Sequence, residues 1–323
     1  MNKNFLILKN VQIENANAIS GICYGFPGLS HFLGFIHALS LKLKDIIPKN
    51  FTKVAIICHN YQVKQQFSET HKTNIFCLTR NPLNKDDSTP SFNEEGKMHL
   101  NISLIIECPF KLDDLPFDGG NKNDDILIFE KLIFNTIFNM KIAGGDIINI
   151  KNIEFFEAKG NNIEEYKVNL KNKMYKFLPG FFLVNRTRYL EEHHKKMCQT
   201  NKDQDILDSF LDFCILKKQS IEENINEKEA SETASIKKIH WKNMAKPYSG
   251  FLVPLHIGYQ SISKLLPEGS VKGARDYKTP FRYVESIYSI GEWKSPHKID
   301  KLDNFNDVFW TYSFKNNTYL FTN

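Results

Sequence analysis

The fold of this chain is decided by the stretch Lys53-Val-Ala-Ile-Ile-Cys-His-Asn-Tyr-Gln-Val-Lys-Gln65. In an extended chain Val54, Ile56 and Cys58 face one side, and the apolar residues between them face the other side. A strand that is apolar on both faces needs cover on both faces, so it lies in the middle of a sheet. We therefore predict a central strand over residues 53–65.

The segments around this strand follow an α+β pattern. The apolar spacing predicts strands at 5–13, 53–65, 72–78, 99–107 and 147–156 and helices at 31–43, capped by Ser30, and 124–140. The order strand, helix, strand, strand, helix and strand, which ends at 147–156, is that of the ferredoxin-like unit, which RNA-recognition modules (RRM) share.

Composition changes along the chain predict three parts. Residues 1–155 form a ferredoxin-like head with an inserted loop at 79–98, and residues 247–323 form a β-rich C-terminal part that packs on the head. Residues 156–246 form a helical region, with one helix expected over Tyr189–Phe213; the family resemblance given below implies that this region is a thumb. Within it we expect a flexible linker at 219–236, because that stretch is rich in Glu, Ser and Asn and lacks an apolar period.

The positive charge is concentrated in the C-terminal third. The chain has a net charge of +5, but residues 236–298 contain eleven Lys and Arg against four Asp and Glu, a local balance of +7. One cationic face beside a balanced remainder is typical of a phosphate-binding surface.

Val271–His297 interleaves cations, aromatic residues and turn formers, and it has no helical or strand period. Cations neutralise phosphates and aromatic rings stack on unpaired bases, so this mixture favours single-stranded nucleic acid as a ligand. The alternative is a packed loop that covers a core, where Tyr and Trp are also common.

Two polar clusters have the chemistry of ligand contacts. In Thr79–Lys85, Arg80 can bind a phosphate or a guanine edge, and the neighbouring Asn residues either read bases or close turns around Pro82. In the second cluster, Gly273–Asp276 is followed by further cations, and Asp276 can neutralise one of them instead of serving a ligand.

The sequence shows no convincing catalytic or metal-binding constellation. Five histidines (His31, His37, His59, His99 and His297) raise the alternative of a nuclease that uses imidazole as acid and base, but core or capping roles fit each one better. The six cysteines lack the Cys-x-x-Cys spacing, so neither a metal nor a disulfide framework is indicated, and we expect no cofactor. No signal peptide or apolar run of eighteen residues is found, so we expect a cytoplasmic protein without membrane contact.

Collinear blocks of residues resemble the family of the second subunit of the type I-F CRISPR Csy surveillance complex. The blocks are Asn15–Ser20, Gly25–Pro27, Gly34–Leu39, Leu78–Asn84, Glu94–Gly96 with His99, Ala143–Gly145, Leu178–Phe181, Gly258-Tyr259, Ala274–Asp276 with Thr279, and Gly291–Trp293 with Ser295–His297. Asp87 departs from the pattern, because it stands where a glycine is expected, and this puts the turn after Asn84 in question.

The resemblance implies a member of the Cas-five branch of the RAMP superfamily, with a ferredoxin-like head and a thumb. It implies a subunit without catalytic activity that grips the 5′ handle of CRISPR RNA (crRNA). Its expected partners are this RNA, the large subunit of the Csy complex and the repeated backbone subunit, with target DNA as a further candidate.

We expect the RNA to be held through residues of the matching blocks and their neighbours. The predicted phosphate contacts come from Arg80, Lys85, Arg275, Lys278 and Arg282. The predicted base contacts come from Asn81, Asn84, Tyr259, Trp293, His297 and Phe26.

Two alternatives remain open at the level of sequence. Some relatives in the same superfamily branch cut precursor crRNA without a metal, so this chain can be an endoribonuclease of that kind. A protein-binding spacer is the other alternative, and its cations would then only make the surface soluble.

Overall fold

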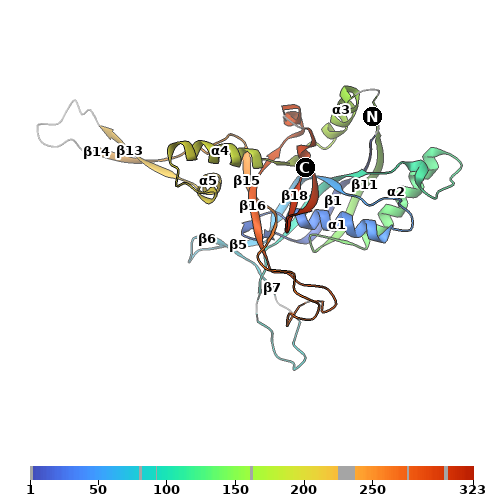
Figure 1. Cartoon of the computed structure of the whole chain (residues 1–323), viewed down its shortest axis with the longest axis horizontal. Coiled ribbons are helices and arrows are strands. Elements are labelled where there is room, and N and C mark those ends of the chain that lie inside the picture. The colour runs from blue at the N-terminus through green and yellow to red at the C-terminus, as the bar shows by residue number, and fades with distance from the viewer. Residues whose placement is uncertain are drawn as a thin grey trace, which may run out of the picture.

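The computed structural model describes residues 3–79, 82–91, 93–160, 163–224, 237–274, 276–301 and 305–323. The described chain has a mixed α+β fold, in which one large antiparallel sheet is surrounded by helices and by short two-stranded pairs (Figure 1). The expected α+β class is confirmed.

The strands of the large sheet, in their order across it, are β10 (Lys141–Ile142), β11 (Gly145–Ala158), β1 (Lys3–Asn17), β9 (Lys97–Cys108), β4 (Lys53–Val63), β12 (Phe181–Asn185), β16 (Val284–Lys294), β15 (Phe251–Ser261), β18 (Thr318–Thr322) and β17 (Phe309–Lys315). The short pairs are β2 (Ile19–Ser20) with β3 (Cys23–Tyr24), β5 (Gln65–Ser68) with β6 (Thr73–Phe76), β7 (Leu78–Thr79) with β8 (Asn93–Glu94), and β13 (Lys218–Asn224) with β14 (Lys237–Asn243).

The helices of the described residues are α1 (Leu29–Lys42), α2 (Lys122–Phe138), α3 (Ile163–Tyr175), α4 (Thr187–Thr200), α5 (Ile206–Cys214) and the 3-10 turns η1 (Leu112–Asp114), η2 (Pro296–Lys301) and η3 (Phe305–Val308). In these parts of the chain, no helix combines the length and the apolar character needed to cross a membrane.

Strand β4 joins the two halves of the sheet, as its apolar pattern predicts. One edge of β4 pairs with β9 along most of its length. The other edge is shared: Ile57 pairs with β12, whereas Val54 and Ala55 pair with β17. Strands β4, β12, β16, β15, β18 and β17 therefore form a closed hydrogen-bonded ring.

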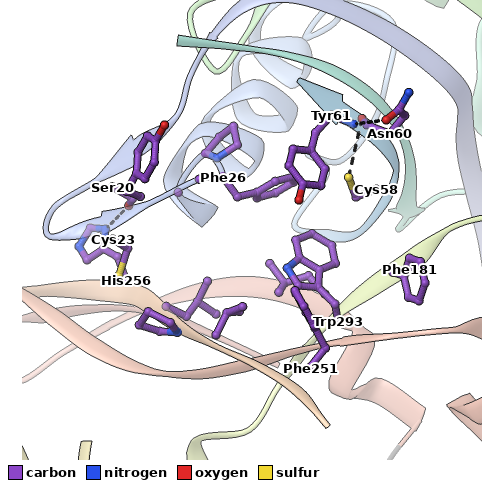
Figure 2. A pocket seen from close by; sticks show the side chains of 18 of the residues that line it. Ser20, Cys23, Phe26, Cys58, Asn60, Tyr61, Phe181, Phe251, His256 and Trp293 are labelled. Atoms are coloured by element: carbon purple, nitrogen blue, oxygen red, sulfur yellow. Dashed lines mark hydrogen bonds between the residues drawn. The ribbon is translucent and has the colours of Figure 1, made fainter. Parts of the chain in front are cut away.

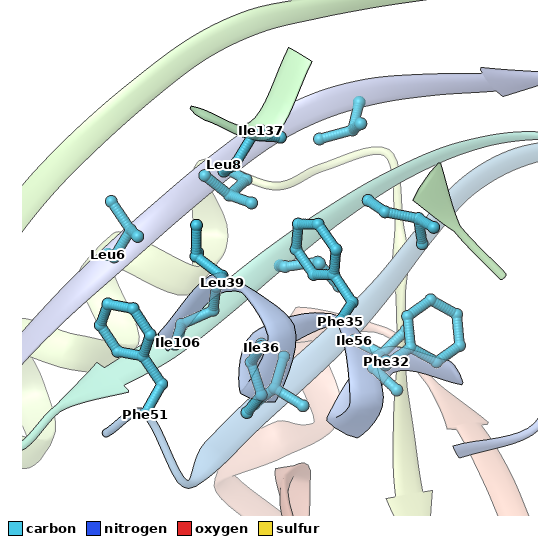
Figure 3. Packing of buried hydrophobic residues seen from close by; sticks show 14 of the residues in the cluster. Leu6, Leu8, Phe32, Phe35, Ile36, Leu39, Phe51, Ile56, Ile106 and Ile137 are labelled. Atoms are coloured by element: carbon cyan, nitrogen blue, oxygen red, sulfur yellow. The ribbon is translucent and has the colours of Figure 1, made fainter. Parts of the chain in front are cut away.

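Both faces of β4 are buried, each in a different core. Ile56 belongs to the larger cluster, in which Phe32, Phe35 and Leu39 of α1 pack on the sheet (Figure 3). Ile57, on the opposite face, belongs to a second cluster with residues of α3, β12 and β17. The two faces of this strand thus belong to two separate hydrophobic cores.

The main helices and strands of the N-terminal half lie where the apolar spacing predicts them. Helix α1 begins at Leu29, two residues earlier than expected, and its N-cap is Gly28 rather than Ser30. A side chain at Gly28 would clash with the Ser20 hydroxyl, because its Cβ would lie 2.2 Å from that oxygen. The predicted strand at 72–78 is reduced to β6, which pairs only with β5.

Three segments of the second half differ, where the structure describes them, from the local sequence pattern. The aperiodic stretch contains β16 (Val284–Lys294), which is held between β12 and β15. The linker expected at 219–236 begins as β13, which pairs with β14, while residues 225–236 lie outside the described chain. The helix expected over Tyr189–Phe213 is two helices, because Asp205 caps the start of α5.

We predict that Ile56→Ala destabilises the protein by about 2–5 kcal/mol, because it leaves a cavity between β4 and α1. The free energy of unfolding, measured with urea, checks this. Ile148→Ala is the matched control: Ile148 is 49% exposed on β11, and its loss is expected to cost no more than about 1 kcal/mol. Equal effects of the two substitutions would contradict the central role of β4.

Candidate nucleic-acid interface

A cleft of about 470 Å³ opens between the N-terminal half of the fold and the closed ring of strands (Figure 2). Phe26, from the loop between β3 and α1, and Tyr61, from β4, lie on one wall. Phe251 of β15 and Trp293 of β16 lie on the other wall, with Phe181 of β12 beside them. The cleft is thus built from segments that are far apart in the sequence.

Two of the predicted stacking residues meet in this cleft. The rings of Phe26 and Trp293 pack edge to face, with their centroids 4.8 Å apart. Phe26 also stacks on Phe32 of α1, at 5.7 Å. Both rings are therefore fixed by packing against the core, and they present a rigid apolar floor.

The rim of the cleft is made of aromatic residues that sequence reasoning missed. Tyr24, Tyr61, Phe181 and Phe251 are 47%, 59%, 51% and 67% exposed, although large aromatic side chains are normally well covered. The available signal was an aromatic residue just beyond a run of buried strand residues, as at Tyr61. That signal does not say which aromatic side chains lie together, because their positions depend on how the strands β4, β12, β16, β15, β18 and β17 close on one another.

His256 ties the wall of the cleft together. It is 2% exposed, its Nε2 donates to the Gly258 carbonyl at 2.8 Å, and its Nδ1 accepts from the Ser20 hydroxyl at 2.9 Å. The Gly258 carbonyl can only accept, so Nε2 carries a proton, and the Ser20 hydroxyl can donate to an unprotonated Nδ1. Burial is the main cause that lowers the pKa of His256 below its ordinary value.

His59 is held in the same way. Its Nδ1 donates to the Pro179 carbonyl at 2.6 Å, and its Nε2 accepts from the Ser103 hydroxyl at 2.7 Å. Burial is again the main cause that lowers its pKa. His31 has a lowered pKa for the same reason, so the three imidazoles near the cleft are neutral groups with structural partners, as the sequence analysis favours.

The thiols of the cleft are protonated. Burial raises the pKa of Cys23 to about 11 and that of Cys58 to about 12, and a protonated thiol is a poor nucleophile. Among the described residues, no three His, Cys, Asp or Glu side chains are grouped so as to hold a metal ion.

Two long loops carry the predicted cations. We call them the β4–β9 arm (residues 64–96) and the β15–β16 arm (residues 262–283). In Figure 1 both arms extend toward the lower part of the view. The β2–β3 hairpin connects them to the cleft, because Tyr24 donates to Gln65 at 3.2 Å and Tyr288, at the base of the other arm, accepts from the Ile22 amide at 3.1 Å.

The β4–β9 arm holds Asn84 and Lys85 in a tight turn. The Asn84 side chain donates to Ser88 at 2.9 Å, and the Asp87 amide donates to the Asn84 carbonyl at 3.1 Å. Asp87 has a φ of 60°, the left-handed conformation that glycine adopts most easily and Asp tolerates. The turn therefore keeps the backbone shape that a glycine would give, with Lys85 exposed.

In the β15–β16 arm, Asp276 organises the loop. Its carboxylate accepts from the Lys278 amide at 2.8 Å and from the Thr279 hydroxyl at 2.5 Å. Lys278 is exposed. Arg282 donates from Nη1 to the Asn317 side chain at 2.7 Å, so it anchors the arm to the β17–β18 turn.

Tyr259 and His297 do not line the cleft. Tyr259 is half-buried and packs on His256, with the ring centroids 4.6 Å apart. His297 is exposed in η2, beside Tyr175 of α3. Arg80, Asn81 and Arg275 lie outside the described residues.

Comparison with known proteins identifies the family. Residues 6–322 match the family model described as CRISPR-associated protein (Cas_Csy2). The chain belongs to the Csy2 family of CRISPR-associated proteins. It is 33% identical, over 313 residues, to the CRISPR-associated protein Csy2 of Pseudomonas aeruginosa (strain UCBPP-PA14), which covers 94% of this chain and 90% of that protein. The match to the Csy2 family runs through both walls of the cleft and both arms, and the suspected resemblance is confirmed.

We predict that the protein loses stability as the pH falls below about 6.5. Folded-state pKa values of His31, His59 and His256 are lowered, so the unfolded chain binds protons that the folded chain does not. The free energy of unfolding is therefore greatest above about pH 6.5, the ordinary pKa of histidine, and it declines as the pH falls below that value. Urea unfolding at several pH values measures this decline.

His59→Gln is the variant that isolates the effect. It removes one of the three depressed groups, so its decline with falling pH is expected to be shallower than that of the wild type. Burial raises the pKa of Glu130, but this contribution is common to both proteins and cancels in the comparison. Parallel profiles would contradict the assignment.

Proposed function

We propose that this chain is a subunit without catalytic activity that holds the 5′ handle of crRNA in a Csy-type CRISPR ribonucleoprotein. The observation that carries the proposal is the match to the Csy2 family over residues 6–322. The cations of the two arms and the aromatic cleft between them supply the chemistry that an RNA end requires.

We infer that the N-terminal half is a ferredoxin-like head of the RAMP type. The support is its strand order, β11-β1-β9-β4, in which all neighbours are antiparallel. Helix α1 follows the first of these strands in the chain and α2 follows β9, as the ferredoxin-like connection requires. RNA-recognition modules use such sheets and their loops to bind single strands.

The arms suit the backbone of the RNA. Lys85 and Lys278 are exposed, one on each arm, and neither has a carboxylate partner among the described ion pairs. Arg282 is already engaged with Asn317, so we assign it the role of fixing the arm. The free ammonium groups are then the phosphate contacts.

The imidazoles near the cleft support a role without catalysis. A general acid or base must exchange a proton with the substrate, but both nitrogens of His256 and of His59 are occupied by protein partners. Their pKa values are lowered by burial, so neither imidazole is a good proton acceptor at neutral pH.

An exposed apolar stripe on α2 supports a place within a larger assembly. Leu127, Phe134 and Phe138 are 62%, 41% and 47% exposed, and the two Phe rings stack on each other at 5.7 Å. Contiguous apolar surface of this kind marks contacts between proteins. We propose that a neighbouring subunit, either the large subunit or the repeated backbone subunit, covers it.

We predict that Lys85→Glu with Lys278→Glu weakens binding of crRNA from the host's own repeat. Each lost phosphate contact lowers the slope of log K against log salt by about 0.7. Fluorescence anisotropy over a salt series measures both quantities. Lys131→Glu, an equal charge change on the exposed face of α2, is the control, and an equal loss for the control would contradict the assignment to the arms.

We predict that the purified protein leaves repeat RNA intact. Incubation with end-labelled RNA, with and without a chelator, followed by gel electrophoresis, tests this. Specific cleavage that persists in the chelator and disappears in His59→Gln would favour the endoribonuclease instead.

A further inference from the structure

The aromatic cleft has no charged wall. None of the described residues that line it is Lys, Arg, Asp or Glu, and its two histidines are neutral for the reasons given above. A phosphate or a carboxylate inside it would lose its water without gaining a counter-charge, which is costly. The group that binds inside the cleft is therefore expected to be uncharged.

The two walls of the cleft favour a planar guest. Phe26 and Trp293 close the floor of the cleft, and the exposed rings of Tyr61 and Phe251 come from its two walls (Figure 2). A flat ring that enters therefore meets aromatic surface below it and at its sides. The volume of about 470 Å³ is within the range of sites for small organic molecules, ~300–1,000 Å³. Stacking on aromatic side chains is how proteins hold unpaired bases.

Polar groups at the rim suit a guest whose edge forms hydrogen bonds. The Asn60 side-chain oxygen accepts from the Tyr61 amide at 2.8 Å, which fixes the carboxamide and leaves its NH₂ group at the exposed rim. The Tyr61 hydroxyl points toward Trp293 (Figure 2). An aliphatic protein side chain would use neither group, whereas the edge of a nucleobase can use both.

Cations begin just outside the cleft. Lys9 lies close enough to His59 to act on its charge, and Lys64, three residues after Tyr61, reaches the side chain of Asn15. Tyr24 of the rim is joined to the β4–β9 arm through Gln65. An apolar interior with a cationic surround is complementary to a nucleotide whose base is inside and whose phosphates are outside.

We propose that the cleft is a socket for one unpaired nucleobase of the bound RNA. The base lies on the floor formed by Phe26 and Trp293, between the exposed rings of Tyr61 and Phe251 with Phe181 beside them, and Asn60 reads its edge. This proposal rests on the proposed function, because it supposes that the chain binds RNA. It adds that one nucleotide is turned out of the RNA strand and that its base, not its phosphate, enters the protein.

An abasic scan tests the proposal on the full chain. The probes are fluorescein-labelled RNAs with the sequence of the host's repeat handle, in which each base in turn is removed while every phosphate remains. We expect one position at which removal of the base weakens binding by about 5- to 150-fold. Phe181→Ala is expected to weaken binding of the intact RNA and to have little further effect on the RNA that lacks this base.

Phe314→Ala is the matched control, because Phe314 is an aromatic residue of β17 that is 67% exposed and does not line the cleft. This variant should bind every probe like the wild type. Should Phe181→Ala fail to fold, Phe251→Ala and 2-aminopurine at the sensitive position replace it. The emission of 2-aminopurine is then expected to be quenched in the wild type and restored in the variant.

Two results are distinguishable failures. If intact RNA binds and every abasic RNA binds equally well, the socket is overturned while the RNA-binding function stands. If no RNA binds, the proposed function fails and the socket fails with it. A third result would also overturn the socket. If the cleft binds a capped amino acid, such as N-acetyl-phenylalaninamide, but binds no nucleobase, the cleft is a site for a protein side chain.

Discussion

The pairing of one edge of β4 with two different strands is the constraint on which the rest of the structure depends. Residues Ile57 and Cys58 pair with β12, and residues Val54 and Ala55 pair with β17. A strand near the carboxyl end of the chain is thereby fixed against a strand of the N-terminal half. Burial of both faces of β4 in separate cores makes this junction rigid.

The candidate site follows from that junction. Closing the ring places β15 and β16 opposite the β3–α1 loop, and the buried Trp310 strengthens the closure by donating from Nε1 to the Leu183 carbonyl at 2.9 Å. His256 adds a second link, from β15 to Ser20. The cleft is thus a consequence of how the ring is closed, and its aromatic walls are held by the same core that stabilises the fold.

The chemistry of the site is divided between two environments. Inside the cleft, aromatic rings and neutral imidazoles exclude charge, because every polar group there has a partner or lies at the rim. On the arms, Lys85 and Lys278 are exposed and surrounded by turn-forming residues. An RNA strand has the same division, because its bases are flat and apolar on their faces whereas its phosphates are charged. The apolar cleft therefore suits the bases, and the cationic arms suit the phosphates.

The sequence by itself determined the local elements and the type of chemistry. The period of apolar residues predicts β4, α1 and α2, because burial of one face or two faces imposes that period on the residues themselves. Phe26 and Trp293 were identified as aromatic candidates, and Lys85 and Lys278 as cationic ones, from residue type and neighbourhood. The resemblance to the family was visible in short collinear blocks.

Only the tertiary structure decided which of these residues meet. Strand β16 has no period of its own, since its neighbours β12 and β15 decide what it buries. Tyr61 lies across the cleft from Phe181 and Phe251, although more than a third of the chain separates it from either of them. Such contacts arise from closure of the ring, a non-local event that leaves no pattern in a short stretch of sequence.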